Sequence, residues 1–219
     1  MKDLFVKTQI HNEIGEIPDF PAEKVNALWR KTPPDSKDIV CDLFLLPFEG
    51  RFGKAEIDYA KSTTLFFLSL LIRDEIKDGA VFSEKEAVLY GDYLFTLAVA
   101  ALPEGENGKD ALPLLETIKT RLEKSVAHKK EGYREETAAA DWGETTRSLA
   151  LKAAEKAERG EGEKAAYAAL GAALGALWGA LYETGSASSS LYSEVEDKAA
   201  ACPFGAELAA YAEKWRDQR

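Results

Sequence analysis

The chain has 219 residues, of which 46% are hydrophobic and 30% are charged, and its formal net charge is -10 at pH 7. This balance is typical of a globular domain in water. The acidic excess argues against nucleic acid as a partner, because phosphate binding requires a concentrated surplus of lysine and arginine. The two histidines, His11 and His128, lie far apart and have no cysteine close by, so the composition also argues against a zinc site.

The first residues, MKDLFVKTQIHNEI, carry charges throughout and do not resemble a secretory signal peptide. Disulfides persist mainly in oxidising compartments. We therefore expect a cytoplasmic protein in which Cys41 and Cys202 are reduced thiols.

Most of the chain shows a helical pattern. Alanine, leucine, glutamate and lysine recur at three- and four-residue spacing, and alternating β-branched runs are missing. Short segments rich in glycine, proline, serine or charge interrupt this pattern, but none is polar and long enough for an interdomain linker. The sequence predicts an all-α bundle of about eight or nine helices, in a single domain that spans residues 1–219.

The longest predicted helix covers residues 54–78, because no proline or glycine interrupts this stretch. A helix of this length would extend roughly 35 Å. After it, Gly79 is placed as a helix C-cap, and Ser83 with Glu86 has the spacing of a capping box. We expect two helices to meet across residues 79–83.

Three acidic residues, Asp74, Glu75 and Asp78, gather at the end of the long helix. At i, i+3 and i, i+4 spacing their carboxylates share one side of the helix, as a Mg²⁺ site requires. Arg73 and Lys77 lie alongside, so the same residues also fit a solvated charge cluster without metal.

The segment of residues 165–182 contains no charged residue. It consists mostly of alanine and glycine, whereas a membrane helix needs about 20 residues of stronger hydrophobicity. Gly171, Gly175 and Gly179 stand four residues apart and would let another helix approach closely. We predict a buried helix in the bundle and no transmembrane segment.

The segments LLIRDEIKD, residues 70–78, and AVLYGDYL, residues 87–94, stand in the same order as the first aspartate-rich region of trans-polyprenyl diphosphate synthases, which they resemble. The resemblance is clear over residues 57–100. It implies an isoprenoid-synthase-like helical bundle. In that family Mg²⁺ held by two aspartate-rich motifs neutralises the departing diphosphate, and basic residues hold the second substrate.

The sequence departs from this family in the charged groups that the reaction needs. Arg73 stands where histidine is usual, and the loop between Asp78 and Gly91 contains no arginine pair. The late helix that should carry the second aspartate-rich motif has Glu183 as its one acid. Each lost charge costs on the order of a hundredfold in rate, so we expect no useful activity from the chain alone and Mg²⁺ bound weakly, or only in a catalytic partner.

Such a degenerate chain resembles the small, component-one subunit of two-component hexaprenyl or heptaprenyl diphosphate synthases. The resemblance implies a non-catalytic subunit that supports chain elongation for the menaquinone side chain. It also implies a catalytic large subunit as partner, a prenyl diphosphate chain as a candidate ligand, and self-association when the subunit is alone.

The resemblance suggests two further roles for the residues around the motifs. Phe66, Ser69 and Leu70 would line a tunnel for the growing prenyl chain, or they fill the chain's own core. Tyr90, Tyr93 and Phe95 would contact the partner subunit, and periodicity alone cannot separate that role from a place in the core.

Two other functions remain open from the sequence. The chain could be a residually active homodimeric prenyltransferase that uses Asp74, Glu75 and Asp78. It could also be a lipid-binding or adaptor helical protein without a synthase partner. A catalytic large subunit that copurifies with the chain would favour the small-subunit interpretation over the adaptor protein, and a Mg²⁺-dependent condensation assay on the pure chain would test the homodimeric prenyltransferase.

Overall fold

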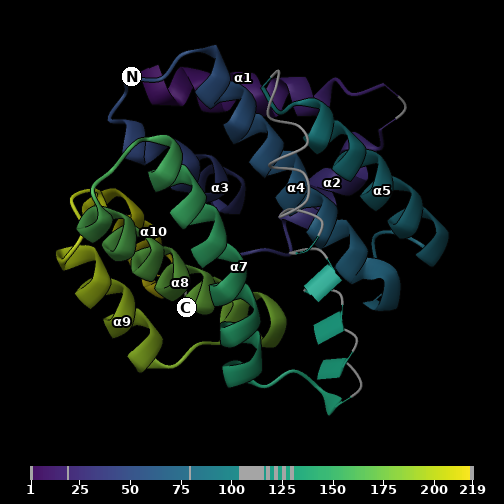
Figure 1. Ribbon diagram of the computed structural model, residues 1–219. Coiled ribbons are helices and arrows are strands. Elements are labelled where there is room, and N and C mark those ends of the chain that lie inside the picture. The colour runs from purple at the N-terminus through teal and green to yellow at the C-terminus, as the bar shows by residue number, and fades with distance from the viewer. Residues whose placement is uncertain are drawn as a thin grey trace. The chain divides into compact units, whose positions relative to one another are not determined.

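The computed structural model of the chain is helical along almost its whole described length (Figure 1). The described residues are 2–18, 20–78, 80–103, 116, 119, 120, 123, 124, 127, 128 and 131–217, without the side chains of residues 2–5, 77 and 78. Over this part the chain forms nine α-helices and one 3₁₀ helix and contains no strand. The predicted all-α fold is confirmed.

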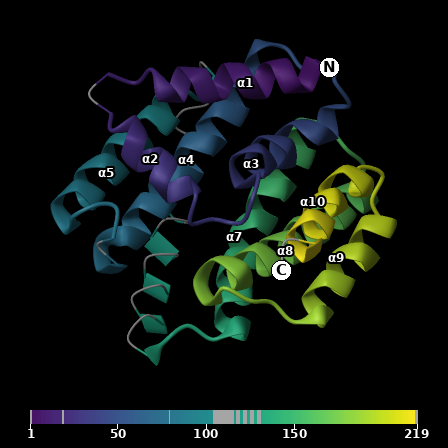
Figure 2. The same cartoon turned by 180° about the vertical axis from the view of Figure 1, so that it is seen from behind.

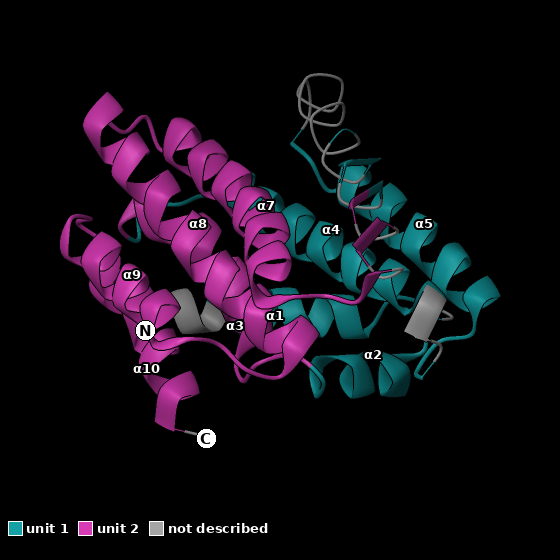
Figure 3. Ribbon diagram, turned by 90° about the horizontal axis from the view of Figure 1, so that it is seen from below, with its two compact units in different colours: residues 1–31, 50–123 teal, residues 32–49, 124–219 magenta. Residues whose placement is uncertain are grey.

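The chain divides into two compact units, which Figure 3 colours separately. Unit 1 contains residues 1–31 and 50–123, and unit 2 contains residues 32–49 and 124–219. Both units are discontinuous in sequence, since the segment 32–49 belongs with the C-terminal half. The single domain expected over residues 1–219 stays a prediction.

Unit 1 is built around one long helix. Its helices are α1 Lys2–Gly15, α2 Ala22–Trp29, α4 Lys54–Asp78 and α5 Glu84–Ala100. The predicted helix over residues 54–78 is confirmed by α4. Helices α4 and α5 lie side by side and antiparallel, as both views in Figures 1 and 2 show.

Every residue of α4 from position 62 to position 75 is buried. Two of the hydroxyls in this stretch have main-chain partners within unit 1: Ser62 Oγ donates to the Ala98 carbonyl at 2.7 Å, and Thr64 Oγ1 donates to the Ala60 carbonyl at 2.8 Å. Because these hydroxyls are satisfied by main-chain carbonyls, polar positions are tolerated inside the core. Burial therefore covers all sides of the helix over residues 62–75.

Unit 2 has an antiparallel helix pair at its centre. Its elements are α3 Ser36–Leu45, η1 Leu46–Phe48, α7 Glu135–Lys156, α8 Glu161–Thr184, α9 Ser189–Ala200 and α10 Gly205–Asp217. Helices α7 and α8 form the central pair. Two buried hydrogen bonds fix α3 to α8: Trp178 Nε1 donates to Ser36 Oγ at 2.7 Å, and Tyr167 Oη donates to the Leu43 carbonyl at 2.7 Å.

The glycines of α8 allow α7 to pack very closely against it. A Cβ atom on Gly175 would lie 1.8 Å from Thr146 Oγ1 and 2.7 Å from the Trp142 carbonyl oxygen. A Cβ on Gly171 or Gly179 would clash similarly with α7. The predicted close approach of another helix to these glycines is confirmed, and α7 is that helix.

Helix α8 also bears on the question of a membrane span. Among the described residues it is the one helix whose length and composition would allow it to cross a membrane, with a mean hydropathy of 1.4 over its most apolar 18 residues. Of that stretch, 61% is buried inside the protein. Such burial is characteristic of a core helix.

The contact between α7 and α8 yields a stability test. We expect Gly175→Ala to lower the free energy of unfolding by about 1–3 kcal/mol, because the added methyl group overlaps the backbone of α7. Gly162→Ala is the matched control, since nothing lies within 4 Å of a Cβ at that position of the same helix. The control should be neutral or up to about 1 kcal/mol more stable, because alanine favours helix. Urea denaturation of both variants measures the difference, and equal effects would contradict the close packing.

Candidate functional site

The helix pair α4–α5 carries the two motifs singled out from the sequence, and a capping box starts its second helix. The Glu86 amide donates to Ser83 Oγ at 3.4 Å, and Glu86 Oε2 accepts from the Ser83 amide at 2.9 Å. The predicted capping box is therefore confirmed. Lys24 of α2 donates to the same carboxylate at 2.6 Å, and this bond together with those from Ser83 lowers the pKa of Glu86 to about 2. The C-cap predicted at Gly79 lies outside the described residues.

Glu75 is 1% exposed and uses both of its carboxylate oxygens within unit 1. Oε1 accepts from Lys31 Nζ at 2.6 Å, and Oε2 accepts from the Val81 amide at 2.9 Å. The carboxylate thus joins the end of α4 to the chain after α2 and to the turn before α5. This arrangement gives Glu75 a structural role that requires no metal.

Arg73 lies across Gly91 to reach Asp92. Its Nη2 donates to Asp92 Oδ1 at 2.6 Å and its Nη1 donates to Ser69 Oγ at 3.0 Å. A Cβ on Gly91 would lie 2.7 Å from Arg73 Cγ, so the absence of a side chain there gives the arginine stem its room. The guanidinium also lies 5.8 Å from the ring centre of Phe95. These contacts join α4 to α5 through three motif residues, Arg73, Gly91 and Asp92.

The structure tests the expected metal ligands in part. Asp74 and Glu75 are both buried, while the side chain of Asp78 lies outside the described residues. Within the described part of the chain, no group of three or more histidine, cysteine, aspartate or glutamate side chains is arranged to hold a metal ion. The Mg²⁺ site stays a prediction, and Glu75 could join it only by giving up its present partners.

The residues expected along a prenyl tunnel all lie in the interior. Phe66, Ser69 and Leu70 are each at most 1% exposed. The Ser69 hydroxyl accepts a hydrogen bond from Arg73, so this small residue makes room for the arginine head group. Their present contacts suit core residues, and a role in substrate binding stays a prediction.

The three residues expected at a partner interface occupy different environments. Tyr90 is half-buried and packs edge-on against Phe20 and Phe82, with ring centres 5.6 and 5.9 Å apart. Phe95 is half-buried beside Arg73, whereas Tyr93 is exposed. Of the three, Tyr93 is therefore the residue that a partner could contact without rearrangement of unit 1.

Helix α5 presents an exposed apolar face. Three large hydrophobic residues among the described ones are exposed, and all lie on α5: Val88 is 45% exposed, Leu89 is 64% exposed and Tyr93 is 37% exposed. We call these three residues the α5 face. Isolated exposed hydrophobic residues are ordinary, whereas contiguous exposed apolar patches are often binding surfaces.

The sequence singles out Tyr90, Tyr93 and Phe95 on this helix and not Val88 and Leu89, although a signal for these two residues is present. Ala87, Gly91, Leu94 and Ala98 are the buried residues of α5, at i, i+4, i+7 and i+11 spacing. Small residues at this spacing mark the side that packs against a neighbouring helix. Apolar residues off that side, such as Leu89, are then expected to face away from the core.

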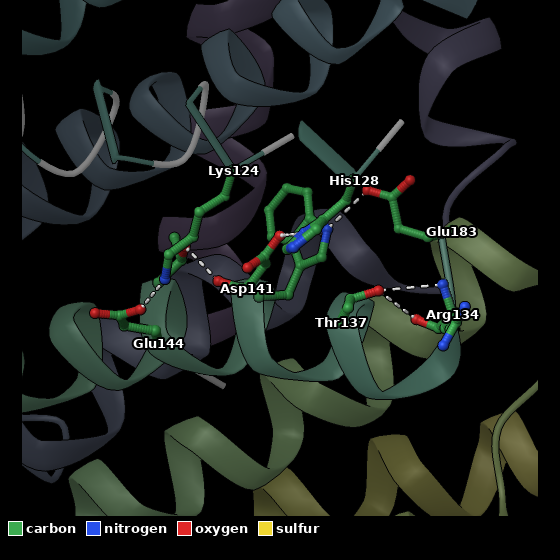
Figure 4. Close-up of polar contacts among 9 residues, drawn as sticks. Lys124, His128, Arg134, Thr137, Asp141, Glu144 and Glu183 are labelled. Carbon is green, nitrogen blue, oxygen red and sulfur yellow. Dashed lines mark hydrogen bonds and ion pairs between the residues drawn. The ribbon is translucent and has the colours of Figure 1, made fainter. Parts of the chain in front are cut away.

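Unit 2 has a second polar cluster, shown in Figure 4. His128 Nδ1 lies 2.8 Å from Asp141 Oδ2, and Lys124 pairs with Glu144 one helical turn further along α7. Glu183, the one acid near the end of the late helix, accepts a hydrogen bond from Trp142 Nε1 at 3.1 Å. This hydrogen bond links the Glu183 carboxylate on α8 to α7.

Comparison of the chain with protein-family models, with curated proteins and with solved structures finds no match.

Glu75→Gln should lower the free energy of unfolding by about 1–3 kcal/mol, because it removes a buried, charge-assisted partner of Lys31. Glu84→Gln, an exposed acid in the first turn of α5, is the control and should change stability by less than about 0.5 kcal/mol. Denaturation is measured with Mg²⁺ and again with a chelator. A loss that appears only when Mg²⁺ is present would show that Glu75 serves a metal instead.

The lowered pKa of Glu86 predicts a dependence of stability on pH. Because folding lowers this pKa from 4.5 to about 2, the ionised carboxylate stabilises the fold above pH 4.5 and loses that effect as the pH falls toward 2. The free energy of unfolding should therefore be higher for the wild type than for Glu86→Gln at pH 6. This difference should become smaller as the pH is lowered toward 2. Denaturation curves at several pH values test this, and a gap that is constant with pH would contradict the assignment.

Proposed function

We propose that the chain is the non-catalytic small subunit of a two-component long-chain prenyl diphosphate synthase, and that it binds its catalytic partner through the α5 face. In this proposal the catalytic large subunit holds Mg²⁺ and the diphosphate groups. The assembly makes the hexaprenyl or heptaprenyl chain used for menaquinone, in the cytoplasm. The similarity of residues 70–78 and 87–94 to the first aspartate-rich region of such synthases supports this class of partner.

The present partners of the charged residues support a non-catalytic role. Diphosphate departure needs carboxylates that can bind Mg²⁺ and cations that can bind phosphate oxygens. In this chain Glu75 is bound to Lys31, and Arg73 is bound to Asp92. Glu183 accepts from Trp142. These groups hold helices together, so the chemistry is better assigned to another subunit.

The exposure of Val88, Leu89 and Tyr93 on one helix is the observation that carries the proposal. Burying a side chain of this size contributes about 1.5–3 kcal/mol, which makes such a cluster a suitable centre for an interface with a polar rim. Lys85 and Asp92, both exposed, flank the apolar residues on the same helix. An apolar centre with charged neighbours is typical of a surface that binds protein.

Reconstitution tests this function. The chain is mixed with a polyprenyl diphosphate synthase from the same genome that has both aspartate-rich motifs, and product chain length is measured with farnesyl diphosphate, isopentenyl diphosphate and Mg²⁺. We expect long-chain product from the mixture and little from either protein alone. Turnover by the chain alone would favour the homodimeric prenyltransferase, and a mixture that forms no complex would contradict the proposal.

A variant pair ties the activity to the α5 face. Leu89→Glu places a charge at the centre of the face without disturbing the core, because Leu89 is 64% exposed. We expect it to weaken subunit binding and long-chain synthesis by about tenfold or more. Ala210→Glu, which adds the same charge at an exposed position of α10, should leave both unchanged. Equal effects of the two variants would exclude the α5 face as the interface.

A further inference from the structure

His128 makes a polar contact in unit 2 that the proposed function does not use. Its Nδ1 atom lies 2.8 Å from Asp141 Oδ2, and the Asp141 side chain is 3% exposed (Figure 4). An ionised carboxylate accepts hydrogen bonds and donates none. In the neutral ring Nδ1 of His128 therefore carries the proton, and the ring lone pair is on Nε2.

The second ring nitrogen of His128 remains available. Among the residues that the structure describes, none forms a hydrogen bond with Nε2, and 26% of the side chain is exposed. The ring of Tyr133 packs edge-on against the imidazole, with 5.8 Å between the ring centres, and restrains it from another side. Proteins build nucleophiles and general bases from an imidazole that is held by a carboxylate at one nitrogen and open at the other.

We propose that His128 is a nucleophile toward uncharged activated esters, and that Asp141 is its positioning residue. In the first step the Nε2 lone pair attacks the carbonyl carbon of a phenyl ester, a C–N bond forms, and the C–O bond to the departing phenolate breaks. The acylated ring is then cationic and keeps its proton on Nδ1, beside the Asp141 carboxylate. In the second step water attacks the acyl carbon, the C–N bond breaks, and a carboxylic acid and a proton are released from the restored ring.

The charges of the cluster favour an uncharged substrate. The carboxylates of Asp141, Glu144 and Glu183 all take part in the contacts drawn in Figure 4, and Lys124 is paired with Glu144. An anionic phosphoryl donor would be repelled by such a group of acids, whereas a neutral ester would not. The cationic acylated ring gains from the same acids, above all from Asp141, because a buried charge is screened less than an exposed one.

Nuclear magnetic resonance of the chain labelled with ¹⁵N at histidine tests the geometry. The sequence contains two histidines, so His11 gives the only other set of imidazole signals. We expect two-bond ¹H–¹⁵N spectra of the neutral rings to show the proton of His128 on Nδ1. A proton on Nε2 would overturn the proposal, because the lone pair would then face Asp141.

Reaction of the full chain with diethyl pyrocarbonate, an uncharged acyl donor, tests the reactivity. Mass spectrometry of a protease digest measures how fast each histidine is modified at about pH 8. We expect His128 to react on the order of tenfold faster than His11 in the same molecules. This comparison needs no variant, so it does not depend on the folding of one. Equal rates would show that the contact with Asp141 is structural only and would overturn the proposal.

Hydrolysis of p-nitrophenyl acetate then tests turnover. His128→Gln should lower the rate of p-nitrophenolate release by the chain about tenfold, and Asp141→Asn should lower it as well, because the cationic acylated ring loses its carboxylate. His11→Gln is the matched control and should leave the rate unchanged. Circular dichroism shows that each variant is folded. If His128→Gln is as active as His11→Gln, the proposal is wrong.

These measurements involve neither the α5 face nor a catalytic subunit, so their outcome is separate from that of the reconstitution. An unreactive His128 in a chain that supports long-chain synthesis would refute this inference and leave the proposed function in place. A reactive His128 without reconstituted synthesis would do the reverse.

Discussion

The contact between the Arg73 guanidinium and the Asp92 carboxylate, made across Gly91, fixes how α5 lies on α4. Because the arginine stem occupies the space beside Gly91, this side of α5 must face α4. Ala87, Leu94 and Ala98 lie on the same side and are fully buried. The opposite side of the helix, with Leu89 at its centre, is then turned outward. Together, this contact and the buried residues place Leu89 on the exposed side of α5.

Ion pairs and hydrogen bonds within unit 1 also explain why acidic and basic residues cluster at the end of α4, in a chain that we propose to be a non-catalytic synthase subunit. A buried carboxylate is costly unless it is paired, and Glu75 is paired twice, by Lys31 and by the Val81 amide. Replacing a whole buried ion pair with apolar residues is often harmless, whereas removing one partner leaves an uncompensated charge. Replacing only one residue of the Glu75–Lys31 pair should therefore destabilise the fold, even if neither residue binds a metal or a diphosphate.

Much of the fold could be predicted from sequence because its signals are local. The unbroken stretch that forms α4, the capping box of Ser83 and Glu86, and the glycine stripe of α8 each follow from spacing within one or two helices. The association of residues 32–49 with the C-terminal half has no local signal, since it depends on contacts such as that between Trp178 and Ser36. Periodicity along one helix does not indicate which distant helix a side chain contacts.

The candidate site was predictable in its location and less so in its roles. The α4–α5 region was singled out from two short segments, and both lie in one helix pair. The spacing of the acids fits a metal site or a solvated charge cluster, and it does not indicate the partners of Glu75, which are Lys31, far away in sequence, and the amide of Val81 in the turn after α4. Tyr90 and Tyr93 lie less than one helical turn apart on α5, and the sequence places both at an interface. In the structure Tyr90 packs against Phe20 and Phe82, whereas Tyr93 is exposed.

We propose that the outward side of α5 binds the catalytic subunit. Hydroxyl-radical footprinting of the chain, with and without that subunit, measures the exposure of individual side chains most directly. We expect Leu89 and Tyr93 to lose most of their reactivity in the complex, while the exposed residues of α9 and α10 keep theirs. Unchanged reactivity on α5 together with protection elsewhere would contradict it.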